Sequence, residues 1–260
     1  MESRRKALWV LSVVLLVSNW QHWTYGKAVP QVPCYFVFGD SLFDNGNNNY
    51  LSTPAKVNYL PYGIDFDTGA SGRCSNGLNI ADTIAEQLGF DSYISDFGVG
   101  GCTNFLDGVN YGSNGAGILD STGSLAGELF TMNIQLYNHN ITVSRIAKIL
   151  GSEEVARKHT DAVFTYINSY EIDSDDQTNT GFTQTRKSCC EVEPGSVPCK
   201  SLSFPCSNRS DYVYWDGAHF STEAKAWAFG KRAYKRQSPK DAYPYDISEL
   251  VKLKLDDSDA

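Results

Sequence analysis

The stretch that decides the fold is FVFGDSLFDNGNNN, residues 36–49. Residues 32–38 (VPCYFVF) have the β-branched and aromatic composition of a buried strand. That run stops at Gly39-Asp40-Ser41, and residues 45–49 then hold one glycine and four asparagines, which are typical of a turn or cap. A glycine permits a sharp turn, and a helix starting just after Ser41 would present backbone N–H groups to a ligand. We therefore expect Ser41 Oγ to be exposed at the carboxyl edge of a sheet, where α/β proteins hold their sites.

Further along the chain, apolar spacing predicts helices that alternate with strands. Residues 78–88 carry their apolar side chains on one helical face, and Gly89 ends that helix. Alternating strands and helices indicate an α/β sheet covered by helices. The other predicted elements are strand character followed by a glycine-rich loop at 109–119, a helix in the second half of 134–150 that ends at Gly151, strands at 162–167 and 212–215, and a helix at 222–234.

The N-terminus predicts export. Three basic residues, Arg4 to Lys6, precede an apolar run at 7–17 that is too short to span a bilayer and fits the core of a signal peptide. We expect residues 1–26 to be this signal peptide and residues 27–260 to be a single domain, located outside the cell or in the cell wall. The 260-residue chain is 42% hydrophobic, which suffices for a folded core. Its formal net charge of −8, without a basic stripe, argues against nucleic acid and anionic membranes as partners.

If the protein is exported, its seven cysteines are expected to form disulfides, because the compartment is oxidising. Four of them lie in CCEVEPGSVPCKSLSFPC, residues 189–206, which we expect to be stapled internally. Zinc is the poorer alternative, because no histidine lies nearby. The odd number leaves one thiol without an intramolecular partner. Asn140-Ile-Thr and Asn208-Arg-Ser are acceptor patterns that predict glycosylation at the surface.

A second motif is YVYWDGAHFSTEAKA, residues 212–226. Asp216 and His219 are spaced so that the carboxylate can reach imidazole Nδ1 while Nε2 faces a nucleophile, and Ser221 is a candidate helix N-cap. A serine hydroxyl needs such a base to become a nucleophile. No Gly-x-Ser-x-Gly elbow occurs, which argues against the usual α/β-hydrolase arrangement. Of the other histidines, His22 lies in the predicted signal peptide, and His139 and His159 are expected to be solvated.

With these motifs, and with residues 57–66, 72–90, 108–118 and 241–247, the chain resembles the plant GDSL (SGNH-type) esterase/lipase family. The resemblance covers almost the whole mature chain. It implies a secreted serine hydrolase with a three-layer α/β/α, flavodoxin-like fold that needs no cofactor. It also implies Ser41 as nucleophile, His219 as general base and then acid, and Asp216 as the carboxylate that orients it. By the same resemblance, the backbone N–H groups of Ser41 and Asn114 form the oxyanion hole.

One departure from the family pattern is large. The family carries a mid-chain Gly-x-Asn-Asp motif whose asparagine donates to the oxyanion, and this chain has none. Residues 149–160 resemble the family's sequence before that motif, and residues 161–172 resemble its sequence far beyond the motif. We therefore expect a missing segment with its junction near Thr160–Asp161, and a sheet that is incomplete in its centre. Losing one such donor costs about 10²–10³ in turnover.

Three functions remain open at this point. The first is a secreted esterase or lipase that hydrolyses acyl esters of a small molecule, lipid or polysaccharide. The second is a truncated, non-catalytic secreted glycoprotein of the same family. The third is an acyltransferase that uses the same three residues with an alcohol in place of water.

Overall fold

The computed structural model describes residues 29–98, 105–160, 163–167, 182–222, 227–238, 241–242 and 244–252. The predicted signal peptide, Cys102 and the residues that directly follow Thr160 at the predicted junction lie outside these ranges. Within the described part of the chain, no helix combines the length and the apolar character needed to cross a membrane.

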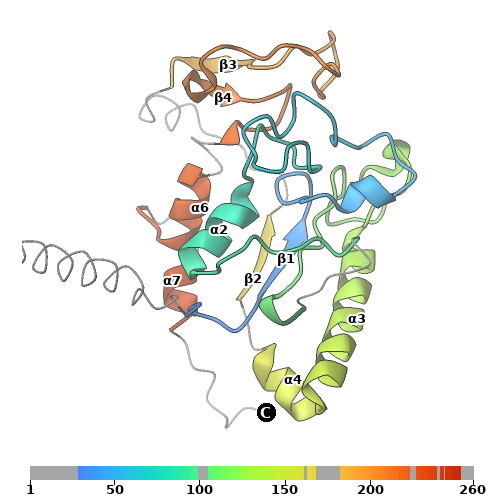
Figure 1. Cartoon of the computed structure of the whole chain (residues 1–260), viewed down its shortest axis with the longest axis vertical. Helices are drawn as coiled ribbons and strands as arrows, with labels where there is room; N and C mark the ends of the chain where they lie inside the picture. The colour runs from blue at the N-terminus through green and yellow to red at the C-terminus, as the bar shows by residue number, and fades with distance from the viewer. Residues whose placement is uncertain are drawn as a thin grey trace, which may run out of the picture.

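A short parallel sheet lies at the centre of the molecule (Figure 1). Strand β1 (Tyr35–Gly39) pairs in parallel with β2 (Val163–Ile167), so the strands expected at 32–38 and 162–167 are confirmed. On the other edge of β1, the Val37 N–H donates to Val109 O (3.1 Å) and the Tyr111 N–H donates to Val37 O (2.8 Å). The expected strand character after residue 108 is therefore limited to this brief pairing before the loop begins.

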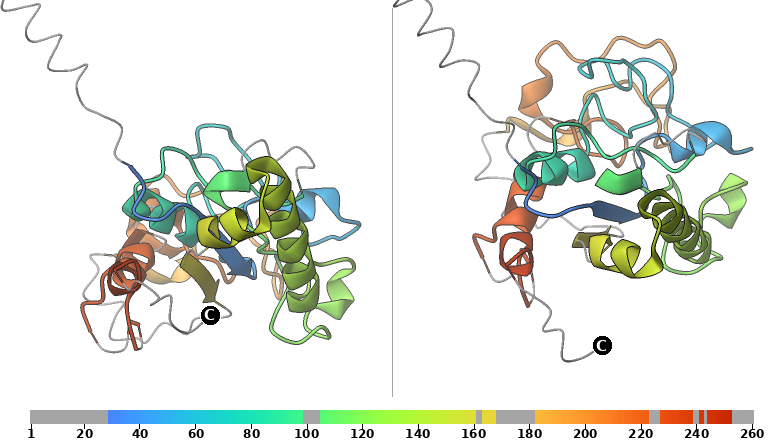
Figure 2. Two further views of the ribbon diagram at one scale, coloured as in Figure 1. Left: turned by 90° about the horizontal axis from the view of Figure 1, so that it is seen from below. Right: turned by 60° about the horizontal axis from the view of Figure 1, so that its bottom comes forward.

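Alternate side chains of β1 pack into two different clusters. Tyr35 and Val37 pack against α2 (Ile80–Leu88). Phe36 and Phe38 pack in a cluster with Ile146 of α3 (Met132–Leu150) and Ala156 of α4 (Glu153–His159). In Figure 1, α2 and α6 lie on one side of the two strands and α3 lies on the other, and Figure 2 shows the same separation from two further directions. Helices therefore cover β1 on both sides, as expected for an α/β sheet.

The helices begin and end at residues whose chemistry explains the boundary. Asn79 caps α2 in a reciprocal capping box with Asp82, and Gly89 ends it in the left-handed conformation (φ 87°). Helix α3 is helical from Met132 onward, so the expectation that only its second half is helical was wrong. Elements that the sequence analysis did not predict are α4, α7 (Ile247–Leu250), β3 (Gln184–Ser188) and the short 3-10 turns η1 (Asn47–Tyr50), η2 (Phe105–Asp107), η3 (Ser124–Ala126) and η4 (Arg209–Asp211).

The cysteine-rich segment forms a second, smaller sheet at one end of the molecule (Figure 1). Here β3 pairs in parallel with β4 (Tyr212–Tyr214), which leads into the 216–219 turn and then to α6 (Trp227–Tyr234). Two nested disulfides, Cys189–Cys206 and Cys190–Cys199, staple the segment internally as expected. Cys74 is buried and forms no disulfide with any described residue.

Candidate active site

Ser41 lies in a tight turn directly after β1. Gly39, the last strand residue, has φ 146°, a conformation that favours glycine. The Asp40 carbonyl accepts the N–H groups of Phe43 (3.2 Å) and Asp44 (3.1 Å), which folds the chain back at once. A helix start just after Ser41 was considered from the sequence, but the next regular element after β1 is η1. The turn itself does hold Ser41 at the carboxyl end of β1, as expected.

Asp216 and His219 lie in a turn directly after β4. The Asp216 Oδ1 atom accepts the backbone N–H groups of Ala218 (2.9 Å) and His219 (2.7 Å), so the carboxylate organises its own turn. The Trp215 N–H donates to His219 O (2.7 Å), which closes the turn from the other side. The His219 Nδ1 atom then lies 2.9 Å from Asp216 Oδ2.

The structure brings the two motifs together across 178 positions of sequence: His219 Nε2 lies 2.8 Å from Ser41 Oγ. Burial lowers the pKa of His219, but the adjacent Asp216 carboxylate outweighs burial and leaves the pKa of the imidazole above its usual value. Burial raises the pKa of Asp216, but His219 and the Tyr62 hydroxyl outweigh it, and the net pKa lies below the usual value. The pair therefore favours an ionised carboxylate beside an imidazole of increased basicity.

The asparagines after Ser41 tie this turn to other loops. Asn47, fully buried, donates through Nδ2 to Asn110 O (3.0 Å) and Gly112 O (2.8 Å) and accepts the Gly98 N–H through Oδ1 (2.9 Å). Asn48 Nδ2 similarly donates to Ala55 O and Asn114 O, both at 2.8 Å. The expected role as turn or cap material is therefore incomplete: these short amides satisfy carbonyl groups of irregular loops that form no ladder of their own.

The predicted oxyanion residues have different surroundings. Among the described residues, the Ser41 N–H makes no hydrogen bond. The Asn114 N–H already donates to Asp44 Oδ2 (2.9 Å). Burial raises the pKa of Asp44 to about 7, although hydrogen bonds from the N–H groups of Asn114, Gly46 and Asn47 oppose this shift. The Asn114 N–H is therefore already hydrogen-bonded to a buried carboxyl group, and the pKa of that group lies near neutral pH.

Gln135 of α3 holds the end of β1 beside the serine turn. Its Oε1 accepts the Gly39 N–H (2.9 Å), and its Nε2 donates to Gly39 O (2.8 Å) and Phe130 O (2.7 Å). The sequence analysis missed this residue, because a glutamine inside a helix gives no sign that it is buried.

Two histidine predictions were wrong. His139 is half-buried, its ring packing against Phe36 at 4.7 Å between centroids, and burial lowers its pKa. His159 is also partly buried, and its Nε2 lies 2.8 Å from Leu106 O. Both histidines therefore help to pack the α3–α4 side of β1 and are only partly exposed. The predicted glycosylation residues Asn140 and Asn208 are both exposed, Asn140 within α3 and not in a turn.

The sequence analysis also missed Tyr62. Its side chain is fully buried, its hydroxyl donates to Asp216 Oδ2 (2.5 Å), and the Cys199 N–H donates to the same hydroxyl (3.1 Å). A tyrosine in a loop carries no sequence pattern that links it to a carboxylate 154 positions away. Only the folded arrangement reveals this contact.

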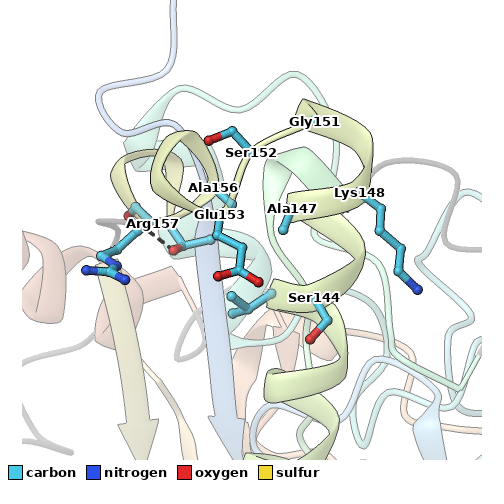
Figure 3. A pocket seen from close by; sticks show the side chains of 10 residues that line it. Ser144, Ala147, Lys148, Gly151, Ser152, Glu153, Ala156 and Arg157 are labelled. Atoms are coloured by element: carbon cyan, nitrogen blue, oxygen red, sulfur yellow. Dashed lines mark hydrogen bonds between the residues drawn. The ribbon is translucent and has the colours of Figure 1, made fainter.

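Two cavities in the described part of the chain lie away from Ser41 and His219. One of about 520 Å³ lies between α3 and α4, and residues such as Ala147, Glu153 and Ala156 line it. Figure 3 shows Glu153 lying between the two helices while Lys148 turns to the outer side of α3. A second, of about 500 Å³, is lined by Leu129, Phe130 and Ile134 among others. Among the described residues, no group of histidine, cysteine or carboxylate side chains is arranged to hold a metal ion.

Comparisons with known proteins agree on one family. The family model described as GDSL-like Lipase/Acylhydrolase matches residues 35–164. An Arabidopsis thaliana protein named a GDSL esterase/lipase is 32% identical over 342 positions, which cover 87% of this chain and 94% of the relative. Another Arabidopsis thaliana GDSL esterase/lipase is 31% identical over 359 positions, with 94% of this chain and 98% of the relative covered. Both alignments are longer than the 260-residue chain, so the relatives contain residues that have no counterpart here.

Proposed function

The chain belongs to the plant GDSL esterase/lipase family, and from that premise we propose that it hydrolyses carboxylic esters through Ser41, His219 and Asp216. The observation that carries this proposal is the 2.8 Å contact between Ser41 Oγ and His219 Nε2, with Asp216 at Nδ1 of the same ring. This is the arrangement that a serine nucleophile requires.

In the proposed reaction, His219 Nε2 takes the hydroxyl proton while Ser41 Oγ attacks the ester carbonyl carbon. The tetrahedral intermediate collapses when His219 returns that proton to the departing alcohol, which leaves an acyl group on Ser41. A water molecule then loses a proton to His219, attacks the acyl group and releases the acid. Asp216 keeps Nδ1 protonated throughout, so Nε2 always faces the reacting oxygen.

The oxyanion of the intermediate needs hydrogen-bond donors. We propose the Ser41 N–H as one donor and the Asn114 N–H as the second. The Asn114 group donates to Asp44 in the structure, so it serves an oxyanion only by sharing or exchanging that hydrogen bond. With no Gly-x-Asn-Asp motif in the chain, we expect turnover below that of relatives that carry one.

The remaining parts of the proposal follow the family. We propose a three-layer α/β/α, SGNH-type fold, to which the packing of helices on both sides of β1 lends support. We also propose secretion, with residues 1–26 removed and Asn140 and Asn208 glycosylated; the two disulfides and the exposure of both asparagines are compatible with this. Small-molecule esters, lipids and acylated polysaccharides are the candidate substrates.

The decisive experiment compares the protein with Ser41→Ala on short-chain p-nitrophenyl esters. We expect the variant to lose ester cleavage and to lose labelling by a fluorophosphonate probe. Ser144→Ala is the matched control, because Ser144 is an exposed serine on α3 that should have no part in the reaction. Equal rates for the native protein and Ser41→Ala, with both well folded by thermal melting, would refute the proposal. If those equal rates do not exceed the uncatalysed rate, the result would favour a non-catalytic glycoprotein.

Acyl transfer to an alcohol is distinguished from hydrolysis by the products that each reaction forms. The same three residues serve both reactions, so mutants cannot separate them. Adding an alcohol acceptor and measuring ester against free acid gives the partition between the two.

A further inference from the structure

We propose that Tyr62 is a positioning residue that extends the proposed catalytic triad by one member and connects it to the disulfide loop. This inference rests on the proposed function, because it assigns a role in a reaction carried out by Ser41, His219 and Asp216. Tyr62 does not touch the reacting atoms. It acts through the Asp216 carboxylate.

Tyr62 directly contacts the carboxylate of the proposed triad. The hydroxyl of Tyr62 lies 2.5 Å from Asp216 Oδ2, the same oxygen that lies 2.9 Å from His219 Nδ1. Tyr62 is fully buried and Asp216 is 1% exposed. Loss of the hydrogen bond between them would leave a buried carboxylate oxygen without this donor, which costs free energy. A hydrogen bond from a neutral donor to a buried carboxylate is among the stronger interactions that a protein makes.

A second hydrogen bond sets the direction of the Tyr62 hydroxyl proton. The Cys199 N–H donates to Tyr62 Oη at 3.1 Å, so the phenol oxygen is already used as an acceptor there. The phenol proton is then directed to Asp216. One chain of hydrogen bonds runs from Cys199 N–H through the Tyr62 hydroxyl to Asp216, and from there through His219 to Ser41.

Tyr62 is held in place by the disulfide loop, residues 189–206. Its ring packs in a cluster with Trp215, Cys74 and the cysteines of both disulfides. The Cys189 and Cys190 N–H groups donate to Trp215 O (3.1 and 2.9 Å), and the Gly217 N–H donates to Val197 O (2.9 Å). The disulfide loop therefore forms hydrogen bonds with the residues on both sides of Asp216 and packs against Tyr62.

The expected effect on the reaction has a definite sign. The Tyr62 hydroxyl stabilises the Asp216 anion and lowers its pKa. Without that hydroxyl, more of the negative charge is available to His219, so the protonated imidazole becomes easier to form and the base is lost at a higher pH. The carboxylate also loses one of the contacts that fix its orientation.

The test compares Tyr62→Phe with Tyr59→Phe. Tyr59 is the matched control: its ring packs edge-on against Tyr62 at 5.4 Å, and its hydroxyl donates to Cys199 O (3.0 Å), but no hydrogen bond joins it to Asp216. For Tyr62→Phe we expect kcat/KM to fall by about tenfold or more, mainly through kcat, and the acid limb of the pH profile to move to higher pH. For Tyr59→Phe we expect neither change.

A second measurement keeps the test informative if turnover is slow. The rate at which a fluorophosphonate labels Ser41 also depends on His219 as base, and its pH dependence should shift upward in Tyr62→Phe alone. Ser41-dependent activity with identical pH profiles for Tyr62→Phe and Tyr59→Phe would overturn this inference and leave the proposed function intact. Ester cleavage that survives Ser41→Ala would overturn the proposed function instead.

Discussion

His219 is the residue whose ionisation should set the pH dependence of ester cleavage. Its pKa lies above the usual value of 6.5 because Asp216 outweighs the effect of burial. A general base works only when unprotonated, so activity should be lost as pH falls through this raised pKa. We predict that kcat/KM on a p-nitrophenyl ester falls on the acid side with a midpoint above pH 6.5.

The control for this prediction is a second ester substrate whose substrate and product groups do not ionise in the pH range of the profile. A midpoint below 6.5 would mean that Asp216 does not support the imidazole as the structure indicates. An Asp216→Asn variant should lower the midpoint, because it removes the charge that raises the pKa.

Asn47 offers a prediction about stability. Its side chain is fully buried and satisfies two carbonyl groups and one N–H from residues 98, 110 and 112. Asn47→Ala leaves the Gly112 carbonyl and the Gly98 N–H without a described hydrogen-bond partner, while Asn110 O keeps the Phe97 N–H (3.0 Å). Each unsatisfied buried group costs about 1–3 kcal/mol. We expect a loss of about 2 kcal/mol or more in the free energy of unfolding, measured by urea denaturation.

Asn49→Ala is the matched control. The Asn49 side chain makes one hydrogen bond, from Nδ2 to Ser71 O at 2.8 Å, and its Oδ1 has no partner among the described residues. We expect a smaller loss than for Asn47→Ala. Similar losses for the two variants would show that the loop, and not the specific hydrogen bonds of Asn47, determines the stability.

At the scale of elements, α2 depends on a buried ion pair. Arg73 forms a bidentate contact with Asp82 in the first turn of α2 (2.7 and 2.8 Å), and Asp82 also completes the capping box. Asp82→Ala leaves the buried guanidinium without its partner, which typically costs about 3–5 kcal/mol. We predict a loss of that size in the free energy of unfolding, measured by chemical denaturation.

The matched comparison is an exposed ion pair on a helix. Glu154 lies 3.4 Å from Lys158 on α4, and both side chains are largely exposed. Glu154→Ala should leave stability almost unchanged, since such pairs contribute little. A loss for Asp82→Ala no larger than that for Glu154→Ala would contradict the prediction.

The helices also show where sequence reasoning succeeds. Helix α2 was predicted almost to the residue, because its apolar side chains face the core and Gly89 ends it. Helix α3 was only half predicted, because its first half reverses this pattern. Gln135 and Asn138 are buried there, while Leu136 and Tyr137 are exposed, so hydrophobic periodicity gives no helical signal.

Other elements were missed for separate reasons. Strand β3 reads QTRKS, and no side chain in it is buried, so nothing in its pattern marks a strand. Helix α4 did carry signals that the sequence analysis left unused: Ser152 caps it, acidic residues occupy its first turn and basic residues its last. In that case the information was present in the sequence.

At the scale of the molecule, the two halves of the proposed site could be suggested from the sequence because each has a local motif. Ser41 follows a buried strand and Asp216 precedes His219 by three positions, and the structure brings these side chains within hydrogen-bonding distance. Tyr62 and Gln135 were not predictable, because their roles arise from contacts 154 and 96 positions away. Supporting residues of this kind are defined by the folded arrangement alone.

The absent Gly-x-Asn-Asp motif leads to a prediction about the whole chain. We expect that inserting the corresponding segment of an Arabidopsis thaliana relative after Thr160 raises turnover by about 10²–10³, because it supplies the further oxyanion donor. It should also raise the melting temperature, since it would cover open edges of the sheet. Ester hydrolysis and thermal melting measure the two effects.

The control carries the same insertion with the motif asparagine changed to alanine. This variant should gain the stability without the full gain in rate. If both insertions leave rate and melting temperature unchanged, the predicted junction at Thr160–Asp161 is wrong.

The nesting of the disulfides has a consequence for resistance to proteases. Cys189–Cys206 encloses Cys190–Cys199, so a single backbone cut anywhere between residues 190 and 206 leaves both products covalently joined. A tryptic cut after Lys200, which is partly exposed, falls inside the outer bridge. The nicked protein would migrate as one species without reductant and as two with it, and Tyr62 would still lie on the same covalent unit as Asp216.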